Sequence, residues 1–223
     1  MARIVDCSRI ITDGMVTDPR LPTPRVTDVW SRERSAEHYA PGVSFQIASV
    51  SMPQNTGTYL DAPFHRFAGT KGVWDTPIEQ FAHLPGVRID VRQCVEEGRR
   101  GIGPEDFANR DLRGCAVLFW SGFDARWDED VYRDNSHPYF TKAAADALVE
   151  AGAQLVGIDA INADDMSDGK RPAHTVMLGA GVHIVENLTN LGELPDDGFH
   201  FTAAPVRVQG LGSFPVRAFA VID

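Results

Sequence analysis

Long hydrophobic runs are absent from this sequence. No stretch approaches the roughly 18 consecutive apolar residues that a membrane-spanning helix requires. The first six residues also lack the apolar run of a secretory signal peptide. We therefore expect a cytoplasmic protein that has no membrane among its partners.

Cysteine is scarce as well. Cys7, Cys94 and Cys115 are odd in number and widely separated, which excludes a disulfide framework and the closely spaced cysteines of a zinc finger. We expect three reduced thiols, buried or at the surface, in a reducing compartment.

An excess of basic charge is missing too. The chain has 31 acidic and 21 basic residues and a net charge of −10, so it should repel nucleic acids and anionic lipids. It also lacks the glycine patterns of dinucleotide-binding and phosphate-binding loops, and the Gly-x-Ser-x-Gly elbow of common serine hydrolases. We expect its partner to be a small molecule.

What the sequence does contain is an ordinary globular composition. With 223 residues, of which 43% are hydrophobic and 23% charged, the chain can bury a substantial core. It has no internal repeat, low-complexity tract or obvious linker. We therefore predict a single domain over residues 1–223.

Strand and helix patterns follow one another in a mixed order. Residues 115–120 and 155–158 are short apolar runs typical of buried strands, and residues 141–151 between them predict a helix that Thr141 caps and Gly152 ends. Other short strands are expected at residues 3–5, 10–11, 43–52, 86–91, 184–187, 199–205 and 217–221. This order predicts an α/β fold with a mixed sheet and flanking helices.

Residues 15–41 form a long polar segment early in the chain. The segment contains four prolines, and we expect a short helix within it near residues 31–39. Loops of this length in a compact domain are usually functional or disordered. We expect an irregular excursion from the domain.

The densest group of chemically active side chains lies in residues 55–66 (NTGTYLDAPFHR). Asp61 and His65 are four residues apart, and Pro63 between them favours a turn or an extended segment over a helix. Both side chains are ligands of divalent first-row metals, and imidazole also carries protons near neutral pH. These residues are therefore candidates for a metal site or an acid/base site.

His174 and Glu186, in the second half of the chain, form a second group of candidate side chains. Apolar residues surround both side chains, which predicts that both are buried. A carboxylate rarely lies in the interior unpaired, so Glu186 needs a metal or a histidine as its partner.

The two groups resemble the sequence blocks of the kynurenine formamidase-like cyclase family of metal-dependent hydrolases and cyclases. The family motif is His-x-Gly-Thr-His-x-Asp-x-Pro-x-His, and this chain matches it at Gly57, Thr58, Asp61, Pro63 and His65. Further blocks follow in family order at residues 118–124, 135–140, 156–165, 171–174 and 186–191. The resemblance implies the family's swivelling β/β/α fold and a homodimer or larger assembly, in which residues 15–41 could complete a neighbour's pocket.

Two positions depart from the family motif. Asn55 and Tyr59 stand where the family has histidines that help to hold one of two metals. An amide and a neutral phenol are poor zinc ligands, so we predict at most one tightly bound metal.

The resemblance implies a ligand set for that metal. Asp61, His174 and Glu186 are the implied ligands, with His65 as a fourth ligand or as an acid/base group. One zinc or manganese ion with an open water position fits these residues, and so does a metal-free acid/base site. We predict that the four side chains converge on one site.

The resemblance also implies hydrolysis of an amide or lactone bond in a small substrate, with aromatic molecules among the candidates, or the reverse ring closure. In this chemistry His65 moves the proton, while the carboxylate of Asp61 holds the metal and Tyr59 donates a hydrogen bond to the oxyanion. The candidate substrate-binding residues are Asn55, Phe64 and Trp30.

Two alternatives stay open. A metal-free cyclase or dehydratase could act on a polyketide-like intermediate, with Asn55, Tyr59, Asp61 and His65 as its acid/base groups. A non-catalytic small-molecule binding protein could keep the same pocket, although it would have less reason to retain all four candidate ligands. Outside this site, we expect Asp164–Asp165 to be a solvated acidic turn.

Overall fold

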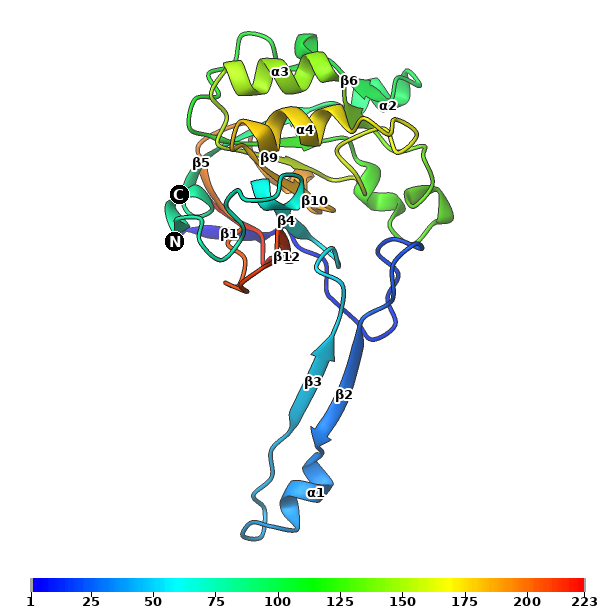
Figure 1. Cartoon of the computed structure of the whole chain (residues 1–223), viewed down its shortest axis with the longest axis vertical. Helices are drawn as coiled ribbons and strands as arrows, with labels where there is room; N and C mark the ends of the chain where they lie inside the picture. Colours follow the sequence, from blue (N-terminus) through cyan, green and yellow to red (C-terminus); the bar gives the residue numbers. More distant parts are fainter. Residues whose placement is uncertain (1, 223) are drawn as a thin grey trace.

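The computed structural model describes residues 2–222, and its centre is a nine-stranded mixed sheet (Figure 1). The strand order is β1-β13-β11-β5-β7-β9-β10-β4-β12. The strands are β1 (Arg3–Asp6), β4 (Tyr59–Asp61), β5 (Leu84–Asp90), β7 (Ala116–Trp120), β9 (Leu155–Ile158), β10 (His183–Glu186), β11 (Phe199–Thr202), β12 (Ser213–Pro215) and β13 (Phe219–Ile222). The predicted α/β class with a mixed sheet is confirmed.

The middle of the sheet is parallel and buried on both faces. Strands β5, β7, β9 and β10 run parallel to one another, and the remaining pairs of the sheet are antiparallel. Along β7, Val117 and Phe119 join one apolar cluster, whereas Ala116 and Leu118 join the cluster on the other face. Burial of both faces explains why this strand is a continuous apolar run in the sequence.

Helices α3 (Lys142–Glu150) and α4 (Pro172–Gly179) cover one face of the sheet (Figure 1). The Thr141 hydroxyl caps α3 by accepting the Ala144 N–H, as predicted. Helix α4 is not predicted above, although Pro172 in its first turn is a common start signal. The shorter helices are α2 (Arg92–Glu96) and the 3₁₀ helices η1 (Pro63–His65), η2 (Ile78–Gln80), η3 (Pro104–Phe107), η4 (Phe123–Arg126), η5 (Asp130–Tyr132) and η6 (Leu191–Glu193).

A long arm projects from the body of the molecule (Figure 1). It consists of the antiparallel strands β2 (Arg25–Trp30) and β3 (Ile47–Ser51), with helix α1 (Arg32–Ala36) between them at the far end. The expectation of an irregular segment over residues 15–41 is therefore wrong for residues 25–30, where β-branched residues form strand β2. The short helix expected near residues 31–39 is present.

Smaller differences concern local elements. Residues 10–11, expected as a strand, lie outside the regular elements, and a short parallel pair, β6 (Gly101–Ile102) with β8 (Tyr139–Phe140), was not expected. Cys7, Cys94 and Cys115 are all buried and free, as predicted. Within residues 2–222, no helix has the length and apolar character needed to cross a membrane.

Candidate active site and metal centre

Four elements bring the sequence-predicted side chains together. Asp61 ends β4, and His65 lies in η1 immediately after it. Strand β10 pairs with β4 and ends at Glu186, while α4 carries His174 over the same edge of the sheet. His174 Nε2 lies 3.5 Å from Asp61 Oδ2 and 3.4 Å from Glu186 Oε1, and the His65 and His174 ring centroids are 5.9 Å apart.

Asp164 fixes the orientation of His174. Its Oδ2 lies 2.6 Å from His174 Nδ1, and its carboxylate also accepts the backbone N–H groups of Ala173 and His174 at the start of α4. Asp164 is therefore buried, and the expectation of a solvated acidic turn is wrong for it. With Nδ1–H bonded to Asp164, Nε2 faces Asp61 and Glu186, and metal-binding histidines are oriented by a partner on the other ring nitrogen in the same way.

The two facing atoms, Asp61 Oδ2 and His174 Nε2, are buried and have no hydrogen-bond partner within residues 2–222. Asp61, His65 and His174 each offer one ligand atom, and these atoms lie within 4.8 Å of one another. Buried polar atoms normally have a partner, so this pair fits a site that binds an ion. Two imidazoles and a carboxylate suit zinc or manganese.

Tyr59 and Glu186 form a second buried pair beside these ligands. The Tyr59 hydroxyl donates to Glu186 Oε2, and Glu186 Oε1 accepts the Ala163 N–H at 2.6 Å. Burial raises the pKa of Glu186 to about 7 and, together with the charges of Glu186 and Asp61, raises the pKa of Tyr59 well above its ordinary value. The Tyr59 proton is thus committed to Glu186 and is not directed at a substrate oxygen.

Burial and neighbouring charges also shift the pKa values of Asp61, His65 and His174. Burial acts to raise the pKa of Asp61, but the adjacent histidines outweigh it and the pKa lies below its ordinary value. Burial lowers the pKa of His65, so its ring favours the neutral form. Burial alone would lower the pKa of His174 as well, but the hydrogen bond to Asp164 and the nearby carboxylates of Asp61 and Glu186 raise it to about 9. Asp61 is therefore a carboxylate at neutral pH, as a metal ligand must be.

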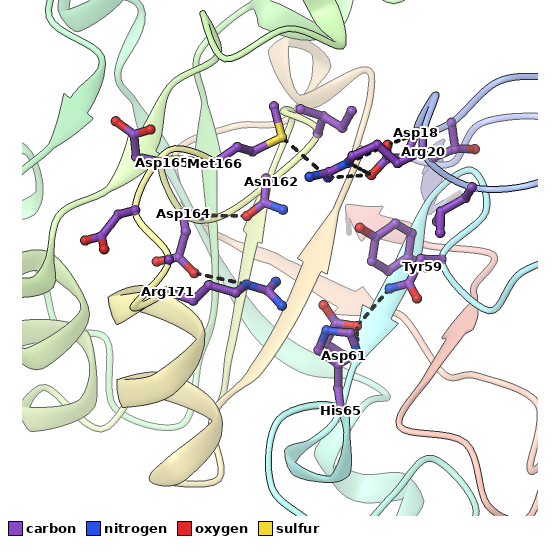
Figure 2. Close-up of a pocket in the computed structure, with 16 residues that line it drawn as sticks. Asp18, Arg20, Tyr59, Asp61, His65, Asn162, Asp164, Asp165, Met166 and Arg171 are labelled. Atoms are coloured by element: carbon purple, nitrogen blue, oxygen red, sulfur yellow. Dashed lines mark hydrogen bonds and ion pairs between the residues drawn. The ribbon is translucent and has the colours of Figure 1, made fainter.

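A cavity of about 370 Å³ opens onto these groups (Figure 2). Asn55, Tyr59, Asp61 and His65 are among the residues that line it, while His174 and Glu186 lie buried behind them. The other lining residues are Thr17, Asp18, Arg20, Leu21, Ile161, Asn162, Asp164, Asp165, Met166, Asp168, Gly169 and Arg171. Arg20 is paired with Asp18 at 2.6 Å, whereas Arg171 Nε lies 3.9 Å from Asp164, beyond hydrogen-bond range.

Trp30 and Phe64, the two aromatic candidates for substrate binding, do not line this cavity. Trp30 lies on the arm, where it packs against His38 and Phe45. Phe64 meets the ring of Trp74 edge-on. Within a single chain, neither side chain is placed to touch a molecule in the cavity.

Three residues of the site escaped the sequence analysis: Asp164, Arg171 and Ser213. Asp164 and Arg171 lie in segments that resemble the family, and those segments were the available signal. Arg171 adopts φ = +47°, a strained backbone conformation of the kind that collects at functional sites. Ser213 carried no signal, because an isolated serine near the end of a chain has no distinguishing neighbours.

The chain is similar to known proteins in both sequence and fold. The family model described as "Putative cyclase" matches residues 5–165. A kynurenine formamidase from Bacillus mycoides is 28% identical over 225 residues, which cover 96% of this chain and 95% of that protein. Isatin hydrolase A from Labrenzia aggregata, solved with benzyl benzoate bound, is 25% identical with a TM-score of 0.84, over 99% of this chain and 94% of that one. A potential metal-dependent hydrolase with cyclase activity shares the fold at 24% identity and a TM-score of 0.79, over 100% and 99% of the two chains.

Proposed function

Because this chain belongs to the "Putative cyclase" family, we propose that it is a hydrolase that uses one divalent metal ion to open an amide or lactone bond of a small molecule. The observation that carries this proposal is the pair of buried, unpartnered atoms, Asp61 Oδ2 and His174 Nε2, at the edge of the cavity. The hydrolase names of the relatives, one for a formamide and one for isatin, support the reaction class.

Asp61 and His174 would hold the metal, with Glu186 facing His174 and His65 beside Asp61. When bound, a zinc or manganese ion would polarise a carbonyl group and lower the pKa of a coordinated water. The pairing of His174 Nδ1 with Asp164 aims Nε2 at the metal position, where a bound metal would replace the Nε2 proton that a pKa of about 9 leaves on the metal-free ring at neutral pH. Negative charge from the carboxylates makes the site selective for cations.

Two other residues would transfer the proton and stabilise the oxyanion. Water adds to the carbonyl carbon, and His65 takes its proton and returns one to the departing nitrogen or oxygen as the C–N or C–O bond breaks. Arg171 extends from the start of α4 into the space beside Asp61 (Figure 2), where its charge can stabilise the developing oxyanion. Tyr59 holds Glu186 in place, and this role replaces the oxyanion contact predicted for it.

The test is metal-dependent hydrolysis. We expect the purified protein, loaded with Zn²⁺ or Mn²⁺, to hydrolyse at least one of isatin, formanilide and dihydrocoumarin, which represent a cyclic amide, a formamide and a lactone. Chelation should abolish turnover, and adding the metal back should restore it. Turnover that is unchanged in metal-free protein would favour the metal-free cyclase or dehydratase instead.

We propose that Asn55 and Tyr59 limit the site to one metal. Each presents a hydrogen-bond donor to a carboxylate, Asn55 Nδ2 to Asp61 at 3.4 Å and the Tyr59 hydroxyl to Glu186, where a ligand nitrogen would be needed for a second ion. We expect the double variant Asn55→His/Tyr59→His to raise the metal content from one ion per chain toward two in elemental analysis. Tyr59→Phe is the control and should stay at one. Two ions in the wild type would contradict the proposal.

We also propose that the protein is a homodimer in which the arm contacts a second copy. A two-stranded ribbon is marginally stable by itself, yet this one exposes Val26, Val29, Ile47 and Val50, with exposed fractions of 45–55%. A partner surface would cover them. In such a dimer, Trp30 of one copy could also reach the cavity of the other copy.

We expect sedimentation of the wild type at micromolar concentration to give a dimer. Val50→Asp with Ile47→Asp should give a monomer, because two charges would replace apolar contacts at the buried centre of the interface. Val206→Asp changes a valine outside the arm that is exposed to 64%, more than Ile47 or Val50, and should leave the dimer intact. A monomeric wild type would contradict the proposal.

A single domain over residues 1–223 and a cytoplasmic location stay predictions.

A further inference from the structure

We infer that Ser213 is a positioning residue that fixes the tautomer and orientation of His65, so that the Nε2 lone pair faces the cavity for the proton-carrying role proposed above. Ser213 begins β12 and is completely buried. Its Oγ lies 2.8 Å from His65 Nδ1 and also contacts Asp61 Oδ1. The inference deepens the proposed function and rests on it for the identity of the reaction.

The directions of these two hydrogen bonds follow from the groups involved. A carboxylate accepts hydrogen bonds and cannot donate them, so the single proton of the Ser213 hydroxyl goes to Asp61. The lone pairs of Ser213 Oγ are then left to accept, and the His65 Nδ1 must supply the N–H. Because a neutral imidazole has one N–H, His65 Nε2 keeps its lone pair for the cavity that this residue lines.

This arrangement fixes which ring nitrogen of His65 is free to act. Nδ1 is the nitrogen that lies 3.6 Å from Asp61 Oδ1, and a metal bound through it would have to break the bond to Ser213. Nε2 is therefore the free nitrogen, and the role of proton acceptor proposed for His65 needs such an oriented ring. The chain Asp61–Ser213–His65 supplies that orientation, in the way that a carboxylate orients the histidine of a catalytic triad.

The backbone holds Ser213 in this place. Ser213 pairs with Asp61 in the β12–β4 register, and the Ala62 N–H donates to Gly212 O at 2.8 Å. A Cβ at Gly212 would lie 2.3 Å from the His65 backbone nitrogen, so glycine is needed for this close approach. Residues 212–213 therefore pack directly against η1.

The first test reads the tautomer without metal or substrate. In metal-free protein labelled with ¹⁵N-histidine, long-range ¹H–¹⁵N correlation spectra show which ring nitrogen carries the proton, and His65→Gln assigns the signal. We expect the Nδ1–H form of His65 in the wild type and in Ser213→Thr, and a mixture or the Nε2–H form in Ser213→Ala. Ser121→Ala is the matched control, because it removes a buried hydroxyl that donates to Asp159 at 2.5 Å, and it should leave the His65 signal unchanged.

The second test uses the metal-loaded enzyme with whichever substrate of the panel it hydrolyses. We expect Ser213→Ala to lower kcat about 10- to 100-fold, as loss of an orienting partner typically does, with KM and metal content unchanged and activity largely restored in Ser213→Thr. An Nε2–H form of His65 in the wild type, or an unchanged tautomer in Ser213→Ala, would overturn the inference. Because the spectra require neither metal nor turnover, they decide it even if the proposed hydrolysis fails.

Discussion

Replacing Asp61 with asparagine is expected to abolish tight metal binding and to lower kcat/KM by roughly 10³-fold or more, because a metal supplies several kcal/mol of transition-state stabilisation. Asp61 Oδ2 is the unpartnered carboxylate oxygen of the site, and it faces the equally unpartnered His174 Nε2. Asparagine keeps the shape of the side chain and an oxygen that can accept the Ser213 hydroxyl. It removes the negative charge that a cation requires.

The measurement is elemental analysis after dialysis, together with titration of Zn²⁺ into metal-free protein followed by calorimetry. Asp159→Asn is the matched control: Asp159 is also completely buried and accepts hydrogen bonds from Ser121 and Gly122, away from the candidate ligands. It should keep the wild-type metal content. An Asp61→Asn protein that binds the metal as tightly as the wild type would exclude Asp61 as a ligand.

Local patterns predicted the elements that depend on neighbouring residues. The apolar run at β7 and the capped, alanine-rich helix α3 are encoded within short windows of sequence, and both are confirmed. Strand β12 has three residues and owes its existence to pairing with β4, about 150 positions earlier in the chain. The arm likewise becomes regular because β2 pairs with β3, a contact that the many prolines before it obscure.

The candidate site likewise contains some residues that local sequence patterns predicted and others that they did not. The motif around Asp61 and the block around His174 pointed to one site, and the structure brings those side chains together. Asp164 looked like a surface residue because its neighbours in sequence are acidic and polar. Its actual partners are the His174 ring and two backbone N–H groups of α4, a helix that the sequence pattern did not predict. Ser213 acts across 148 positions of sequence, so no local pattern could mark it.

Replacing His65 with alanine is expected to lower kcat about 10²- to 10⁴-fold, the usual contribution of a general acid/base group, while the fold, the oligomer and the metal content stay unchanged. The physical reason is the placement of the ring. Burial lowers its pKa, so the imidazole is neutral and can accept a proton, and Ser213 holds its Nδ1 so that Nε2 is available. The side chain is 16% exposed and lines the cavity, so added imidazole should restore part of the lost activity.

Metal content decides what a loss of activity in His65→Ala means, because loss of a ligand can reduce turnover as much as loss of a base. A variant that keeps its metal and responds to imidazole has lost its proton carrier. Metal and activity that disappear together would make His65 a ligand through Nε2 and would contradict the proton-carrying role proposed for it. If the wild type holds no metal and still depends on His65, the metal-free cyclase or dehydratase is the correct reaction class. A fully active His65→Ala enzyme would refute both reaction schemes, since each needs this imidazole to move the proton.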